Sequence, residues 1–136
     1  MNDESYIDEE MGPNPELNRV TNLIIGAAIA VHRELGPGYS ESTYEAALAP
    51  EFNARSIRFV RQAIFPVLYR GEQVGECRVD FLVEDIVVVE LKAVETLHPL
   101  FTNQVISYLK ATQRRLGLIL NFNVNQLIKG VRRVAR

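Results

Sequence analysis

The sequence has 136 residues, of which 47% are hydrophobic and 24% are charged, which is enough for one globular domain with a packed core. The longest apolar run, Leu23 to Val31, is far shorter than the roughly 20 residues that a membrane-spanning helix needs, so no membrane partner is expected. The single cysteine, Cys77, excludes an intramolecular disulfide and fits a reducing compartment, so we expect a cytoplasmic protein.

Charge is distributed unevenly along the chain. Residues 1–16 contain six acids and no Lys or Arg, whereas the remaining residues carry 15 bases and 11 acids, a net charge of +4. This mild excess of basic residues after residue 16 suits a partner that carries phosphate, and it is equally compatible with a solvated basic surface. We expect residues 1–14 to form a flexible acidic tail and residues 15–136 to form a single domain.

Two helices are predicted at the start of the domain. Apolar residues at helical spacing indicate a helix from about Pro15 to Leu35, which Gly36-Pro37-Gly38 should end. Ser40 is a suitable N-cap for a second helix over about Glu41 to Arg55. Pro50 lies inside this second pattern, and because an interior proline costs about 3 kcal/mol or more, we expect a kink or an early break there.

Three strands are predicted next. Phe59 to Tyr69 is rich in β-branched and aromatic residues, Val74 to Val83 follows after a turn, and Val87 to Leu91 is a nearly continuous apolar run. Such a run is typical of a central strand that is buried on both faces. Pro66, within the first strand, indicates an edge strand or a bulge.

The last third of the chain is predicted to alternate helix and strand. We expect a helix from about Leu100 to Ala111, a short buried strand from Leu116 to Leu120, and a last helix from Gln126 to Val134. This order of elements predicts an α/β domain.

Charged residues occur in the central strand, where an isolated buried charge would be costly. Glu90 and Lys92 are two residues apart, and therefore on one face of a strand, while Asp80 lies on the preceding strand. Two carboxylates and the backbone carbonyl of Leu91 would offer the oxygen ligands that Mg²⁺ or Mn²⁺ prefers. Lys92 could then orient a water molecule or stabilise developing negative charge. The structural alternative is an ordinary Glu–Lys pair on a solvated face.

Whether Asp80 and Glu90 meet depends on the turn between their strands. A two-residue loop would pair Val79 with Glu90 and direct Asp80 to the opposite face. A three-residue loop over residues 84–86 would instead pair Asp80 with Glu90. Such loops usually place their third residue in the left-handed region, which Ile86 disfavours, so a bulge elsewhere is an alternative route.

Five short motifs follow one another along the chain. They are G-x-x-E-x-x-Y from Gly38 to Tyr44, Val79-Asp80, Glu90-Leu91-Lys92, the run from Gln104 to Leu109, and the run from Gly117 to Phe122. In these motifs the chain resembles, from about Leu17 to Arg133, the GxxExxY protein family, which is grouped with the PD-(D/E)xK nuclease superfamily. The resemblance implies a restriction-endonuclease-like αβββαβ core with a mixed central sheet flanked by helices.

The resemblance also implies roles for particular residues. Asp80 and Glu90 match the metal-binding acids, and Lys92 matches the catalytic lysine. Glu41 matches an acid that joins the metal site in exonuclease-like members, although the first residue of a helix could simply stabilise the helix N-terminus. Val79 stands where the superfamily's name has proline.

Supporting residues are implied in the same way. Gln104 and Tyr108 match a Q-x-x-x-Y element and lie on one helical face, where they could hold the site lysine or the nucleic acid backbone, or be packing and surface residues. Tyr44 and His32 are further candidates, with a core aromatic and a structural histidine as the simpler interpretations. Phe101 stands where many relatives have His, which leaves the contribution of its loop open.

These features favour a phosphodiesterase that uses Mg²⁺ or Mn²⁺ and acts on nucleic acid, with DNA preferred over RNA. Two buried acids would repel phosphate in the absence of a metal, which favours catalysis over simple binding. A catalytically silent module that binds nucleic acid or protein on the nuclease scaffold is the alternative. A homodimer would supply two sites for cutting two strands.

Overall fold

The computed structural model describes residues 14–136, so the expected acidic tail, residues 1–14, lies outside the described residues except for Asn14. The helices are α1 (Pro15–Leu35), α2 (Glu41–Ala54), α3 (Pro99–Thr112) and the short 3₁₀ helix η3 (Leu127–Gly130), and the strands are β1 (Phe59–Tyr69), β2 (Glu72–Val83), β3 (Val87–Lys92), β4 (Leu116–Asn121) and β5 (Val131–Ala135). None of the helices in this range is long and apolar enough to cross a membrane.

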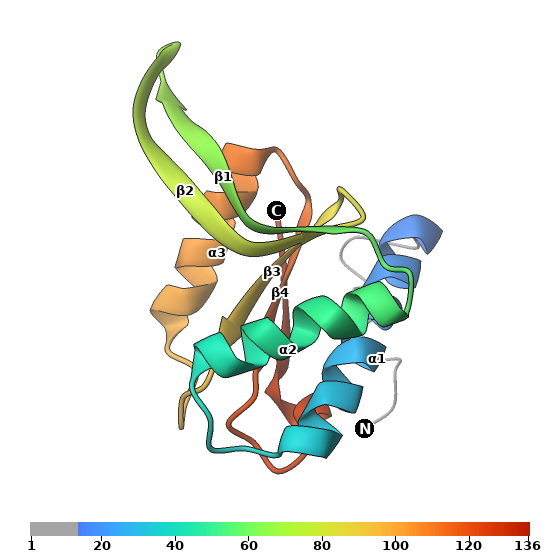
Figure 1. Cartoon of the computed structure of the whole chain (residues 1–136). Helices are drawn as coiled ribbons and strands as arrows, with labels where there is room; N and C mark the ends of the chain where they lie inside the picture. Colours follow the sequence, from blue (N-terminus) through green and yellow to red (C-terminus); the bar gives the residue numbers. More distant parts are fainter. Residues whose placement is uncertain (1–13) are drawn as a thin grey trace.

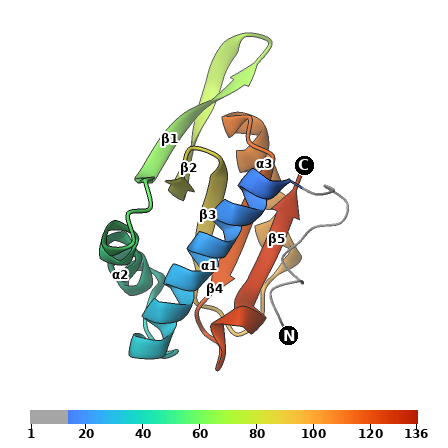
Figure 2. The ribbon, with the colours of Figure 1, turned by 90° about the vertical axis from the view of Figure 1, so that its right-hand side faces the viewer.

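The five strands form one mixed sheet in the order β1-β2-β3-β4-β5, in which β3 and β4 are parallel and all other neighbours are antiparallel. Figures 1 and 2 show α1 and α2 on one face of the sheet and α3 on the other. An apolar cluster fills the space on each side, one beneath α1 and α2 and one beneath α3. The predicted α/β architecture, a mixed sheet flanked by helices, is therefore confirmed.

The two N-terminal helices begin where the sequence predicts. Asn14 caps α1 through a 3.1 Å hydrogen bond from the Leu17 N–H to its side-chain oxygen, and Gly36 ends α1 with a φ of 70°. Ser40 occupies the N-cap position of α2, but its hydroxyl bonds to those of Ser42 and Thr43 instead of to the helix backbone.

The predicted early break at Pro50 is wrong, because α2 continues to Ala54. The last turn of α2 is held by Phe52, which is fully buried and packs against Phe59 and Phe81 at ring-centroid distances of 5.4 and 5.3 Å. Burial of a phenylalanine contributes about 1.5–3 kcal/mol, which offsets much of the cost of an interior proline.

The predicted C-terminal helix over residues 126–134 is also wrong. Only Leu127–Gly130 is helical, as one 3₁₀ turn, and the chain then forms β5. Strand β5 pairs with β4 along its whole length, from Leu120 opposite Val131 to Leu116 opposite Ala135. Without β5 the fully buried strand β4 would present unpaired backbone groups, so tertiary pairing determines the conformation here.

The hairpin of β1 and β2 changes face at Gln62 and Asp80. Arg61 pairs with Phe81 and Ala63 with Val79, while Gln62 between them has a φ of 54°. Phe81 packs in the cluster beneath α1 and α2, but Val79, only two residues away, packs in the cluster beneath α3. Beyond this kink the hairpin projects from the body of the molecule (Figure 1). The expected edge position of the strand that contains Pro66 is confirmed.

Candidate active site

The turn between β2 and β3 sets the relation of the two central acids. Val83 pairs with Val87, which leaves a three-residue connection and gives Asp80 and Glu90 the register expected of opposite residues. The left-handed residues are Glu84 and Asp85, with φ values of 50° and 63°, so Ile86 does not have to adopt the conformation it disfavours.

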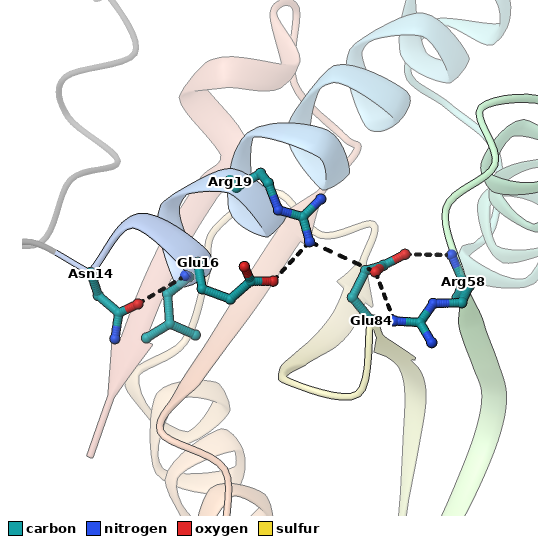
Figure 3. Close-up of polar contacts among 6 residues, drawn as sticks. Asn14, Glu16, Arg19, Arg58 and Glu84 are labelled. Carbon is teal, nitrogen blue, oxygen red and sulfur yellow. Dashed lines mark hydrogen bonds and ion pairs between the residues drawn. The ribbon is translucent and has the colours of Figure 1, made fainter.

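Arginines from three parts of the chain lie against this turn, and Figure 3 shows two of them, Arg19 and Arg58, beside Glu84. Glu84 accepts hydrogen bonds from the backbone N–H of Arg58 at 2.8 Å and from its guanidinium at 3.2 Å, and Arg19 of α1 lies 3.8 Å away. The backbone N–H of Arg58 is the largest cause of a lowered pKa of the Glu84 carboxyl. On the other side of the turn, Arg114 donates to the carboxylate of Asp85 at 2.9 Å.

Asp80 and Glu90 exchange hydrogen bonds with each other's strands. The Asp80 N–H donates to Oε2 of Glu90 at 2.7 Å, and the Leu91 N–H donates to Oδ2 of Asp80 at 2.8 Å. The backbone ladder between β2 and β3 extends only to the pair of Phe81 and Val89, so the two carboxylates accept backbone donors where the ladder stops. The arrangement places two carboxylates side by side at the point where β2 leaves the sheet.

Burial makes this pair costly to ionise. Burial first, and then the nearby carboxylate of Asp80, raise the pKa of Glu90 to about 8 against the opposing effects of the Asp80 N–H and of Lys92. Burial also raises the pKa of Asp80, opposed mainly by the Leu91 N–H. Two such groups side by side favour a bound cation, because a positive charge would allow both to ionise.

A chain of polar contacts that the sequence did not predict connects Asp80 to α2. The side-chain amide of Gln62 donates to Oδ1 of Asp80 at 3.2 Å and to Oε1 of Glu45 at 2.9 Å. The other oxygen of Glu45 accepts from Arg61 at 2.7 Å. A positive φ is uncommon for a residue such as Gln62, and it directs the amide toward Asp80.

Lys92 lies over an aromatic ring of α3. Its ammonium nitrogen is 4.3 Å from the ring centroid of Phe101, within the range of a cation–π interaction. The first turn of α3 thus contributes Phe101 to the site, at the position where the resemblance leads one to expect a histidine. His98 caps α3 by accepting a 3.0 Å hydrogen bond from the Leu100 N–H, so it also shapes this loop.

The remaining candidates divide between the site and the core. Tyr108 is half-buried on α3, and its pKa is raised first by burial and then by the charge of Glu90. Gln104, one turn earlier, is exposed. Glu41 is exposed at the start of α2, and its charge is the weakest of the influences that raise the pKa of Glu90.

Tyr44 and His32 have structural contacts. Tyr44 is fully buried, donates to the Gly36 carbonyl at 2.6 Å, and stacks on Phe122 with ring centroids 4.4 Å apart. His32 is buried, and its Nε2 donates to the carbonyl of Val124 at 2.8 Å, since a carbonyl can only accept. Neither has a contact with Asp80 or Glu90 among residues 14–136, which agrees with the simpler interpretation of each.

A family model for the PD-(D/E)XK nuclease superfamily matches residues 18–134, nearly the whole chain. The chain belongs to this nuclease superfamily. No curated protein and no solved structure matched the chain. The finer assignment to the GxxExxY family stays a prediction. Nucleases of this superfamily typically use divalent metal ions, so Asp80 of β2 and Glu90 of β3 are candidates to hold one.

The residues present fit such an ion. No three His, Cys, Asp or Glu side chains come close enough in residues 14–136 to hold a metal by themselves. Mg²⁺, however, is commonly held by one or two carboxylates and keeps several waters, so Asp80, Glu90 and the Leu91 carbonyl would suffice. A cation bound there would lower the raised pKa values of both acids.

Without a divalent metal, the free energy of unfolding should fall as the pH rises from about 5 to about 9. The pKa of Glu90 is raised from 4.5 to about 8 in the folded state, so its contribution to stability is fully present below the unfolded value and is lost as the pH rises through the folded value. At about 1.4 kcal/mol for each pKa unit, the loss should be roughly 3–5 kcal/mol, and the raised pKa of Asp80 adds to it with the same sign.

Urea unfolding at several pH values in the presence of chelator measures this loss. Glu90→Gln should remove most of the pH dependence of the free energy of unfolding. The matched change Glu76→Gln, at an exposed acid of β2, should leave that dependence unchanged. A wild-type profile that is flat or rises over this range would contradict the burial of an unpaired Glu90.

Proposed function

We propose that the protein is a metal-dependent nuclease that hydrolyses DNA, with Mg²⁺ or Mn²⁺ held by Asp80, Glu90 and the Leu91 carbonyl. The observation that carries the proposal is the pair of neighbouring carboxylates, buried Glu90 and half-buried Asp80, which accept hydrogen bonds of 2.7 and 2.8 Å from the backbone N–H groups of Asp80 and Leu91 at the end of the β2–β3 ladder. Membership of the nuclease superfamily supports the same reaction class. A bound divalent ion would supply a water of lowered pKa and offset charge on the scissile phosphate.

The residues around the acids would orient the reactants. Lys92, two residues after Glu90 and packed on Phe101, is the group proposed to orient the attacking water or to stabilise the developing negative charge. The ring of Phe101 restricts the positions of the lysine side chain without neutralising it, because a cation–π contact leaves the ammonium free to donate hydrogen bonds. Tyr108 and the exposed Gln104 are proposed to contact the nucleic acid backbone, and Glu41 to join the metal ligands through water.

Gln62 and Glu45 are proposed as positioning residues for Asp80. Oδ2 of Asp80 accepts from Leu91, and Oδ1 accepts from Gln62, so both oxygens of the carboxylate are restrained. Glu45 in turn holds the amide of Gln62 from the side of α2. Restraint on both sides lowers the reorganisation needed when a ligand-bound geometry forms.

A catalytically silent module remains the second candidate. The observation that favours it is that no three acids among residues 14–136 lie close enough together to hold a metal ion, and that Glu41 is exposed and has the weakest effect on the pKa of Glu90. A scaffold that had lost metal binding could still bind nucleic acid through the basic body of the chain.

Cleavage of linear duplex, single-stranded and branched DNA and of structured RNA, in Mg²⁺ and in Mn²⁺, tests the nuclease directly. We expect a metal-dependent DNA cleavage that chelator abolishes and that falls by about 100-fold or more in Asp80→Ala and in Lys92→Ala, the typical effect of removing a catalytic group. Glu76→Ala, the matched removal of an exposed acid, should retain the activity. Equal traces of cleavage in all of these proteins would favour the silent module.

We also propose that the protein forms a homodimer through the projecting hairpin. Ile64, Leu68, Tyr69 and Val74 on this hairpin are between 50% and 66% exposed, an apolar surface of the kind that marks an interface. Sedimentation equilibrium should give a mass near twice 15.4 kDa for the wild type and a lower mass for Leu68→Lys. The matched change at exposed Leu100, away from the hairpin, should leave the mass unchanged. A single mass of 15.4 kDa at all concentrations would refute the dimer.

A further inference from the structure

A cavity with both polar and apolar walls lies apart from the two acids, between the end of α1 and the loop that follows β4. Its volume is about 510 Å³, which is within the range of small-molecule sites. Polar side chains of His32, Arg33, Asn125 and Gln126 line it, together with apolar ones that include Ile29 and Leu127. Among residues 14–136, none of those that line it is acidic.

Two segments that line the cavity are near residues of the candidate active site in the sequence. The N–H of Phe122 donates to the carbonyl of Lys92 at 2.9 Å, so the loop after β4 starts beside the site lysine. Asn125, three residues later, has its Cα within about 11 Å of that of Phe122, because consecutive Cα atoms are about 3.8 Å apart. On the other side, Gly36 of the cavity wall leads in five residues to Glu41 at the start of α2.

The groups in the cavity match the parts of a nucleotide. Arg33 is exposed and has no ion pair or hydrogen bond with any residue of the described range 14–136, so its guanidinium is available for a phosphate. Asn125 and Gln126 are exposed and offer donors and acceptors for the edge of a base. Ile29 and Leu127 provide an apolar wall for the flat face of a base or a sugar.

We propose that this cavity binds one nucleotide of the substrate strand outside the scissile position, with its phosphate on Arg33. The inference rests on the proposed nuclease function and adds a subsite that would hold the strand in register with Asp80, Glu90 and Lys92. Because His32 donates its Nε2 hydrogen to Val124, its ring also braces the loop that carries Asn125.

Binding is tested without cleavage, in chelator, by fluorescence anisotropy of labelled single-stranded DNA. Arg33→Gln should weaken binding by about 10-fold and reduce the dependence of log K on log salt by about one phosphate contact. Arg132→Gln removes the same charge from an exposed arginine of β5 and should change the affinity by less than about twofold, as expected for one distant surface charge. Thermal unfolding of both variants separates binding from loss of the helix-end stabilisation that Arg33 gives to α1.

NMR titration with thymidine monophosphate locates the ligand. We expect shifts of the side-chain amides of Asn125 and Gln126 that Arg33→Gln abolishes and that the oligonucleotide competes away. A nucleotide that binds there but is not displaced by the oligonucleotide would overturn the assignment to the substrate strand. Equal affinities of Arg33→Gln and Arg132→Gln would overturn the subsite altogether.

The subsite and the nuclease can fail separately. Metal-dependent cleavage by the wild type with the same KM in Arg33→Gln would leave the nuclease standing and refute the subsite. Nucleotide binding in the cavity by a protein that cleaves none of the substrates would keep the subsite and refute the nuclease.

Discussion

The register of β2 against β3 is the constraint on which the site depends. A slip of one residue would direct either Asp80 or Glu90 to the opposite face of the sheet and separate the two carboxylates. The turn that sets this register contains two residues with positive φ, Glu84 and Asp85. Arg58 holds Glu84 (Figure 3), and Arg114 holds Asp85. Exposed ion pairs usually contribute little to stability, but these two hold the turn that sets the register of β2 against β3.

The carboxylates accept backbone N–H groups that would otherwise be unpaired where the β1–β2 hairpin leaves the sheet. Their hydrogen bonds satisfy the donors of Asp80 and Leu91, so the site also completes the fold at this point. Burial and the neighbouring carboxylate raise the pKa of Glu90 to about 8, so ionisation of Glu90 is costly in the folded chain. An ion that bound both acids as proposed, and only in the folded chain, should therefore stabilise it.

Much of the fold could be predicted from sequence, because α1, β3 and β4 have apolar patterns that only one element type explains. Strand β5 was missed because Val131 and Val134 are three residues apart, as on a helix, and only the edge of β4 decides between the two. At the site, the acids and Lys92 stood out as charges in an apolar strand. Gln62 and Glu45 could not be predicted, because they meet Asp80 only through a kink that has no signature in the residues themselves.

Calorimetric titration of Mn²⁺ at pH 7, in two buffers with different ionisation enthalpies, tests the metal centre most directly. Because the pKa of Glu90 is raised to about 8, Glu90 should lose its proton when the ion binds. We therefore expect binding to Asp80 and Glu90 with a release of about one proton. Asp80→Ala should lose the binding, Glu90→Gln should lose the proton release, and Glu76→Ala should retain both. Absence of binding in the wild type, or binding that is unchanged by both site variants, would contradict a metal centre at these two acids.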